Sequence, residues 1–192
     1  MQGQNHPKLK MSYVCGVSAP PLRYQTVGQN LDEAVRKWGA RDALVVRHQN
    51  VRWTYKEFGE RVDRFAAGLA ALGLEPGDRV GIWAPNCWEW TVVQFATAKL
   101  GLILVNINPA YRLTELEFSL NWVECKALSL ADRHKSSDYV AMVRDLAPEI
   151  SEAAPGKLKA ARLPHLRIVI RMGKDRTPGF YNLGDIFEMA TD

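Results

Sequence analysis

The sequence predicts an α/β domain with a mainly parallel sheet, flanking helices from βαβ units and an N-terminal β-hairpin. Short apolar runs at residues 79–84 and 102–107 have the composition of buried strands. Residues 87–100, between these runs, carry apolar side chains on nearly every side of a helix. A strand, a helix and a strand joined by short connections form a βαβ unit, which implies parallel pairing through a right-handed crossover.

The length of 192 residues suits one domain, and a hydrophobic content of 47% is ordinary for a globular protein. Residues 1–25 carry no acidic side chain and are predicted to be an N-terminal arm, partly disordered or vector-derived. No apolar run approaches the roughly 18 residues of a transmembrane segment. The three cysteines lack C-x-x-C spacing, which favours reduced thiols in an intracellular protein.

Two elements are predicted near the start of the domain. Residues 31–38 read as a short helix, with Asn30 as its cap and Gly39 after its end. Two β-rich runs, at residues 43–47 and 51–53, flank a three-residue polar link. This arrangement predicts the hairpin.

A capping box begins the next helix, because Thr54 and Glu57 can each accept a hydrogen bond from the other's backbone. The apolar positions that follow recur every three or four residues and form one stripe: Phe58, Val62, Phe65, Leu69 and Leu72. Gly73 stands where a left-handed residue ends a helix. We expect this stripe to be buried and Arg64 to lie on the opposite, solvent-facing side.

Asn86 and Glu89 repeat the capping arrangement before the apolar helix, which should be covered on several sides. Residues 102–107 show no polar–apolar alternation, which predicts a strand buried on both faces. Thr114 and Glu117 predict a third capping box. The stripe of that third helix comprises Leu113, Leu116, Leu120 and Val123.

The last third of the chain adds a strand at 127–130, a helix at 137–146, a basic linker at 155–164, a strand at 166–171 and a short helix within 181–189. Residues 157–176 carry seven Lys or Arg and one Asp. Such a segment could attract CoA phosphates, nucleic acid or anionic lipid, but we favour a solvated linker. Since no aromatic side chains interleave with the basic ones, no nucleic-acid partner is expected.

No motif supplies a catalytic, cofactor-binding or metal-binding residue. Gly68 and Gly73 have P-loop spacing, but Leu74 and Glu75 stand where Lys and Ser/Thr would reach phosphate and magnesium. The four histidines are scattered without paired ligand spacing. The cluster at residues 132–134 (Asp-Arg-His) follows a predicted strand, where α/β sites gather. Without a nucleophile or metal partner, we interpret it as ordinary loop polarity.

Two stretches resemble core motifs of the AMP-forming adenylate superfamily. Residues 53–58, WTYKEF, are similar to the first motif, usually Leu-Thr/Ser-Tyr-x-Glu-Leu. Residues 99–111, KLGLILVNINPAY, are similar to the second, a Lys-x-Gly, an apolar strand and a Pro-x-Tyr ending. Asn106 and Asn108 replace the Pro and Asp of peptide-synthetase domains. The residues of this motif are therefore more similar to those of the acyl-CoA synthetase branch, which includes bacterial fatty-acid CoA ligases.

The resemblance implies that residues 26–192 are the first part of the AMP-binding N-terminal domain of such an enzyme. Its members use ATP, Mg and CoA to convert a fatty acid or other carboxylate to acyl-AMP and then to acyl-CoA. The family's nucleotide loop, its metal- and ribose-binding acids and its catalytic Lys have no counterpart here. We therefore expect an inactive scaffold that binds no cofactor and packs against the remainder of the same enzyme, with a homo-oligomer as a further option.

Two alternatives stay open. One is a free-standing α/β binding or interaction module, since three βα units can fold alone. The other is a different adenylate-forming branch. A cytoplasmic location is expected, with the mitochondrial matrix as the alternative for a eukaryotic source.

Overall fold

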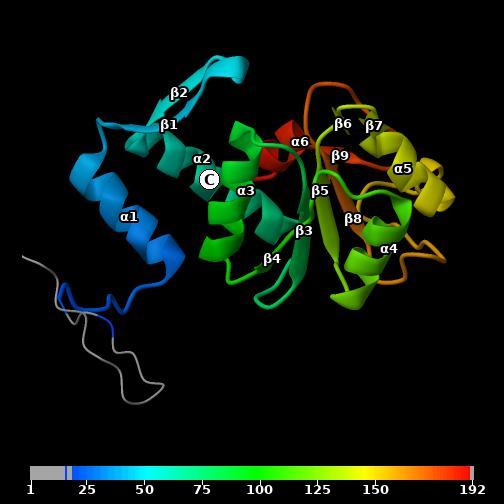
Figure 1. Ribbon diagram of the computed structural model, residues 1–192, viewed down its shortest axis with the longest axis horizontal. Coiled ribbons are helices and arrows are strands. Elements are labelled where there is room, and N and C mark those ends of the chain that lie inside the picture. The colour runs from blue at the N-terminus through cyan, green and yellow to red at the C-terminus, as the bar shows by residue number, and fades with distance from the viewer. Residues whose placement is uncertain (1–15, 17–18, 191–192) are drawn as a thin grey trace, which may run out of the picture.

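A five-stranded parallel sheet forms the centre of the structure, a computed structural model that describes residue 16 and residues 19–190 (Figure 1). In spatial order its strands are β4 (Ile103–Asn106), β3 (Arg79–Trp83), β5 (Ala127–Leu130), β8 (Ile168–Arg171) and β9 (Tyr181–Asn182). Each neighbouring pair is parallel. The predicted mainly parallel α/β architecture is confirmed.

Helices cover both faces of this sheet (Figure 1). One face carries α2 (Tyr55–Ala71), α3 (Trp88–Lys99) and α6 (Leu183–Glu188), and the other carries α4 (Leu113–Trp122) and α5 (Tyr139–Leu146). The first helix, α1 (Val27–Trp38), packs outside α2 and α3. The apolar helix α3 is therefore covered on several sides, as its composition predicts.

The two faces of the sheet bury two separate apolar clusters. Successive side chains of a strand point to opposite faces. In β3, Val80 and Ile82 accordingly join the cluster beneath α2 and α3, whereas Trp83 joins the cluster beneath α4 and α5. Every residue of β5 is buried, which places this strand at the centre of the core.

Helix α1 begins earlier than predicted. Thr26, rather than Asn30, is its cap: Thr26 Oγ1 accepts from the Gln29 amide at 3.1 Å, and Gln29 Oε1 accepts from the Thr26 amide at 3.0 Å. The hairpin is confirmed as antiparallel strands β1 (Asp42–Val46) and β2 (Val51–Thr54). The short 3-10 helix η1 (Arg47–Gln49) joins them.

The capping box of α2 is confirmed, since the Glu57 amide donates to Thr54 Oγ1 at 3.3 Å and the Thr54 amide donates to Glu57 Oε2 at 2.8 Å. Its stripe is buried as far as Leu69, and Leu72 is half-buried. Gly73 ends the helix with a φ of 78°, in the left-handed region that favours glycine.

The predicted cap of α3 was wrong. Asn86 does not cap this helix. Gln49, from the turn of the hairpin, does so instead: its Oε1 accepts from the Trp88 amide at 2.8 Å, and its Nε2 donates to Glu89 Oε2 at 2.8 Å. Local spacing could not show this cap, because the folded hairpin brings Gln49 to the helix from 39 residues away.

Helix α4 is also capped differently from the prediction. Its box is closed by Glu115, whose Oε2 accepts from the Arg112 amide at 3.1 Å. Glu117 instead binds Arg162, with Arg162 Nε donating to its Oε1 at 2.9 Å. The predicted stripe still holds in its centre, where Leu116 and Leu120 are buried.

Strand β4 is not buried on both faces, as its apolar sequence had predicted. It lies at the edge of the sheet, and the side chain of Ile103 is 52% exposed. An apolar run indicates that a strand is hydrophobic, but it does not show whether the strand has a neighbouring strand on each side.

The C-terminal third corrects two further predictions. The helix predicted from residue 137 begins at Tyr139, capped by Asp138, because β7 (Ser137–Asp138) pairs with β6 (Arg133–His134) before it. Residues 155–164 form no regular element, yet Leu158, Ala160 and Leu163 are buried in the cluster beneath α4 and α5. This segment belongs to the folded domain and is not a solvated linker.

Truncating the stripe of α2 should destabilise the fold. Leu69 is fully buried, so Leu69→Ala should lower the free energy of unfolding by about 2–4 kcal/mol in urea titrations. Arg64 is not a neutral control, because its Nε donates to the Phe187 carbonyl at 2.8 Å. The exposed Glu60 is the matched control, and Glu60→Ala should change stability by about 0.5 kcal/mol or less. Equal losses would show that the stripe does not face the core.

The cap supplied by Gln49 gives a second prediction. Gln49→Ala removes the acceptor of the Trp88 amide and the donor to the buried Glu89, and should cost about 1–2 kcal/mol. His48→Ala, an exposed neighbour in the same turn, should cost about 0.5 kcal/mol or less. Thermal and urea unfolding measure both. Indistinguishable variants would mean that the hairpin does not stabilise α3.

Candidate functional site

The carboxyl ends of β3, β5 and β8 meet at one edge of the sheet, the edge at which α/β proteins bind ligands. The segments that follow these strands are residues 85–87, 131–133 and 172–173. Together with residues 48–49 of the hairpin turn and Glu89, they line a cavity of about 240 Å³. This cavity is the candidate site.

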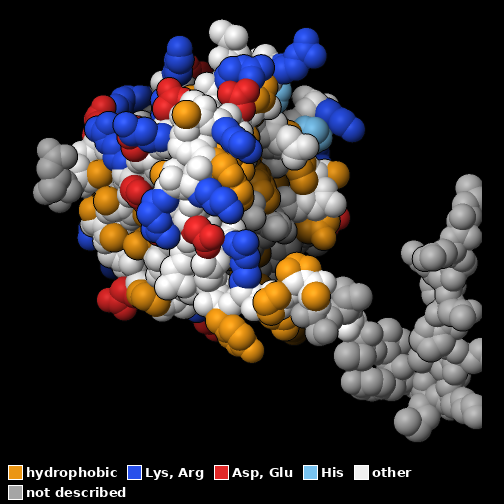
Figure 2. All heavy atoms as spheres, turned by 90° about the vertical axis from the view of Figure 1, so that its left-hand side faces the viewer, with side chains coloured by type: hydrophobic (Ala, Val, Ile, Leu, Met, Phe, Trp, Pro, Cys, Tyr) orange, Lys and Arg blue, Asp and Glu red, His pale blue; other side chains and the backbone are white. Residues whose placement is uncertain are grey.

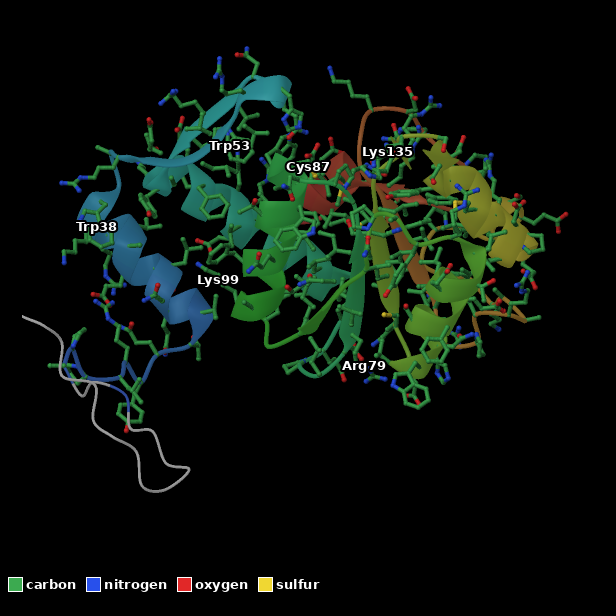
Figure 3. The ribbon with its side chains drawn as sticks, viewed as in Figure 1. Trp38, Trp53, Arg79, Cys87, Lys99 and Lys135 are labelled. Atoms are coloured by element: carbon green, nitrogen blue, oxygen red, sulfur yellow. The ribbon has the colours of Figure 1, made fainter. Side chains whose placement is uncertain are left out.

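On the hairpin side of the cavity, polar groups bind one another. Gln49 is held by the Trp88 amide and by Glu89, and the Glu89 side chain is buried. Cys87 lies at the start of α3 (Figure 3). Burial raises the pKa of its thiol to about 12, and the nearby carboxylate of Glu89 adds to this effect. The thiol therefore stays protonated at neutral pH, so it is a poor nucleophile.

Arg171, the last residue of β8, does not line the cavity but bonds to Asp132, which does. Its Nε donates to Asp132 Oδ1 at 2.6 Å, and its other nitrogens donate to Thr177 Oγ1 at 2.6 Å and Asp175 Oδ2 at 3.2 Å. The hydrogen bond to Asp132 raises the pKa of the arginine, against the opposing effect of burial. The guanidinium charge is thus matched by neighbouring carboxylates and joins two strand ends to one loop.

Of the cluster at residues 132–134, Asp132 and Arg133 line the cavity and His134 does not. Asp132 faces Arg171, whereas Arg133 and His134 form β6 of a small hairpin. In the part of the chain that the structure describes, no group of three or more His, Cys, Asp or Glu could hold a metal ion. Among the described helices, none is long and apolar enough to cross a membrane.

The P-loop-like glycines serve packing. A Cβ on Gly68 would lie 1.9 Å from the carbonyl oxygen of Ile186, so only glycine lets α6 approach α2 this closely. Gly73 is the left-handed end of α2. In the structure, Gly68 therefore serves helix packing and Gly73 ends a helix.

Residues of the second resembling motif also make structural contacts. Lys99 bonds to Asp32 of α1 and Asp63 of α2. The turn at the far end of the motif is held from the core: Trp83 Nε1 donates to the Asn108 carbonyl at 3.1 Å, and the Tyr139 hydroxyl donates to the Pro109 carbonyl at 2.6 Å. The rings of Trp83 and Tyr139 stack 3.6 Å apart. The residues of this motif therefore hold neighbouring helices, strands and turns together.

Sequence reasoning missed two side chains around the cavity: Gln49, which lines it, and Arg171, which bonds to its lining residue Asp132. Arg171 ends a predicted strand, and the register Leu130↔Arg171 explains why it reaches the segment after β5. That register is visible only once the sheet has formed. Gln49 offers no local signal at all.

Comparisons with known proteins identify the family. The sequence model of the AMP-binding enzyme family matches residues 31–175. The zebrafish (Danio rerio) protein named medium-chain acyl-CoA ligase ACSF2, mitochondrial, is 44% identical over 185 residues, covering 96% of this chain and 30% of that protein. The human protein of the same name is 44% identical over 160 residues, or 83% of this chain and 26% of the relative. The chain thus spans less than a third of their length.

Solved structures share the fold. Acetoacetyl-CoA synthetase from Streptomyces lividans superposes with a TM-score of 0.71 at 25% identity, over 87% of this chain and 25% of that protein. A long-chain-fatty-acid-CoA ligase from Archaeoglobus fulgidus gives a TM-score of 0.71 at 18% identity, over 95% of this chain and 33% of the other. With the family match covering most of the described residues, the chain belongs to the AMP-binding enzyme family.

Proposed function

We propose that this chain is the N-terminal part of an AMP-forming acid–thiol ligase, an acyl-CoA synthetase. The parent enzyme converts a fatty acid or other carboxylate and ATP to an acyl-adenylate, and then transfers the acyl group to CoA. The family match over residues 31–175 carries this proposal, supported by relatives at 44% identity that are named medium-chain acyl-CoA ligases. Their names make a medium-chain fatty acid the first substrate to test.

Within the parent, the role of this part is that of a scaffold. Adenylation requires donors around the ATP phosphates, a metal held by carboxylates and a cation at the developing negative charge. Arg171, which bonds to the cavity-lining Asp132, is already matched by Asp132 and Asp175. Lys99 is engaged by two carboxylates between helices. The groups that bind ATP, Mg and CoA therefore come from the rest of the parent.

Open apolar surface supports the remainder of the same enzyme as a partner. Phe118 and Trp122 stack on the outer side of α4 with exposed fractions of 63% and 76%, and Ile103 is exposed at the sheet edge. Apolar surface of this kind favours association with other protein surfaces. A second copy covering it would give a homo-oligomer.

The proposed location is cytoplasmic, and the mitochondrial matrix is the alternative for a eukaryotic parent. The zebrafish and human relatives are both named mitochondrial. Fractionation of the source cells with an antibody to this chain distinguishes the two compartments.

Exchange kinetics separate the parent from this part. The 192-residue chain should show no carboxylate-dependent ATP–pyrophosphate exchange with short-, medium- or long-chain acids, because it lacks the groups that bind and activate ATP. The parent should catalyse exchange, and should form acyl-CoA once CoA is added. Both are measured with labelled pyrophosphate, with heat-treated parent as the blank.

Exchange by the chain alone would refute the scaffold role. Saturable ATP binding by the chain at millimolar nucleotide, without exchange, would favour a free-standing binding module. A parent with neither exchange nor acyl-CoA formation would contradict the proposed activity.

A further inference from the structure

The outer side of α4 carries a group of exposed apolar side chains. Phe118 and Trp122 lie one helical turn apart, and their rings stack with centroids 5.5 Å apart. Half of the exposed large apolar side chains in the described residues belong to this part of the chain, and we name them the α4 patch: Ile103, Tyr111, Phe118 and Trp122. The inner side of α4 already packs Leu116 and Leu120 against the sheet. A helix that is apolar on two sides needs a second cover.

Ile103 extends the patch from α4 onto the sheet. Alternate residues of a strand point to one face, so Ile103 shares the face of Val105, which packs against the cluster beneath α4 and α5. Strands β4 and β5 are both parallel to β3, so α4, which joins them, runs back toward the amino edge of the sheet. The end of α4, at Trp122, and the start of β4, at Ile103, therefore lie toward the same edge.

The remainder of the parent and a second copy of the chain compete for this patch, and the path of the chain favours the second copy. The last described helix, α6, packs with α2 and α3 on the opposite face of the sheet, and α1 lies outside these helices. Helix α4 lies across the sheet from all of them (Figure 1). A segment that follows α6 therefore starts on the face away from the patch.

The charged residues at α4 and against it favour a protein partner over a membrane. They are balanced in sign, with three arginines and three glutamates: Arg79, Arg112, Arg162, Glu115, Glu117 and Glu124. An anionic membrane attracts surfaces with an excess of Lys and Arg. Such side chains gather instead on the face that carries α1 and the hairpin (Figure 2).

The order of charges along α4 suits a second copy. Arg112 and Glu124 stand six residues before and six residues after Phe118. Two copies of α4 that pack antiparallel about a two-fold axis at Phe118 bring Arg112 of each copy to Glu124 of the other. A cation is unfavourable at the start of a helix. Among the described residues no carboxylate binds the Arg112 guanidinium, which donates to Ser137 Oγ at 2.7 Å, so a carboxylate from the second copy would compensate its charge.

We propose that the α4 patch is the contact surface of a homodimer in which α4 packs antiparallel against α4 of a second copy. Aromatic side chains and Arg are enriched in protein interfaces, and Trp is frequent among the residues that dominate binding. The ten residues of α4 span about 15 Å, so the contact is smaller than the roughly 800 Å² per partner of a standard interface. The dimer is therefore weak and depends on concentration.

Sedimentation equilibrium of the parent, and of the 192-residue chain, measures this dimer across micromolar concentrations. Trp122→Ala should raise the dissociation constant at least about tenfold, because it removes the most exposed side chain of the patch. Tyr24→Ala is the matched control, since Tyr24 is an aromatic residue that is 98% exposed before α1, and it should leave the constant unchanged. Both variants should keep the urea midpoint of the unaltered chain, because neither side chain is buried.

A charge reversal tests the antiparallel arrangement itself. Arg112→Glu turns two attractive contacts per dimer into repulsive ones and should raise the dissociation constant about fivefold. Adding Glu124→Lys to the same chain makes both contacts attractive again and should restore the constant to within about twofold. A double variant that dimerises no better than Arg112→Glu would contradict the antiparallel arrangement.

Ligase activity, measured in parallel, separates this inference from the proposed function. A monomeric parent with ligase activity overturns the inference alone. A dimer that depends on Trp122, in a parent without activity, supports the inference and contradicts the proposed function. A dimer that Trp122→Ala leaves unchanged forms through another surface and overturns the inference.

Two further results assign the patch to other occupants, and each overturns the inference. Dimerisation of the 192-residue chain that is absent from the parent assigns the patch to the remainder of the enzyme. Binding of a monomeric parent to phosphatidylserine vesicles that is lost in Trp122→Ala assigns it to a membrane.

Discussion

One ammonium group, that of Lys99, joins three helices. Lys99 is the last residue of α3, and its side chain, only 15% exposed, bonds to Asp32 of α1 and Asp63 of α2 (Figure 3). Burial alone would lower the pKa of this lysine, but the two carboxylates outweigh burial and raise it. The C-terminus of α3 also favours a cation. Because α3 has little polar surface of its own, this charge fixes where α1 and α2 cover it.

The close packing of the three helices around Lys99 also explains other residues in them. A Cβ on Gly28 would lie 3.0 Å from Lys99 Cγ, so a small residue lets α1 approach α3. Phe58 of α2 and Phe95 of α3 meet edge to face at 5.4 Å. The Lys of the Lys-x-Gly motif that resembles the adenylate superfamily therefore has a structural role in this part of the protein. The family can therefore be recognised from residues whose contacts in this structure hold helices together.

The elements that sequence predicted well are those specified locally. The Thr54–Glu57 box, the α2 stripe and the parallel strands all follow from spacing along a few residues. The predictions that failed depended on contacts between residues distant in sequence. Gln49 caps α3, Arg162 binds Glu117, and β4 lies at the edge of the sheet. The candidate cavity belongs to the second kind. Its position at the carboxyl edge follows from parallel pairing, but the roles of Gln49 and Arg171 depend on contacts that only the assembled sheet creates.

The most direct test of this account is a double-mutant cycle between Lys99 and Asp63, followed by urea unfolding. Lys99→Met should lower the free energy of unfolding by about 1 kcal/mol, because it removes two ion pairs whose carboxylates are partly exposed to solvent. Asp63→Asn should cost less, since Asp32 remains bonded to Lys99. The double variant should lose less than the sum of the single losses by about 0.5–1 kcal/mol. Additive losses, with Lys99→Met costing under about 0.5 kcal/mol, would show that the three helices do not depend on this charge.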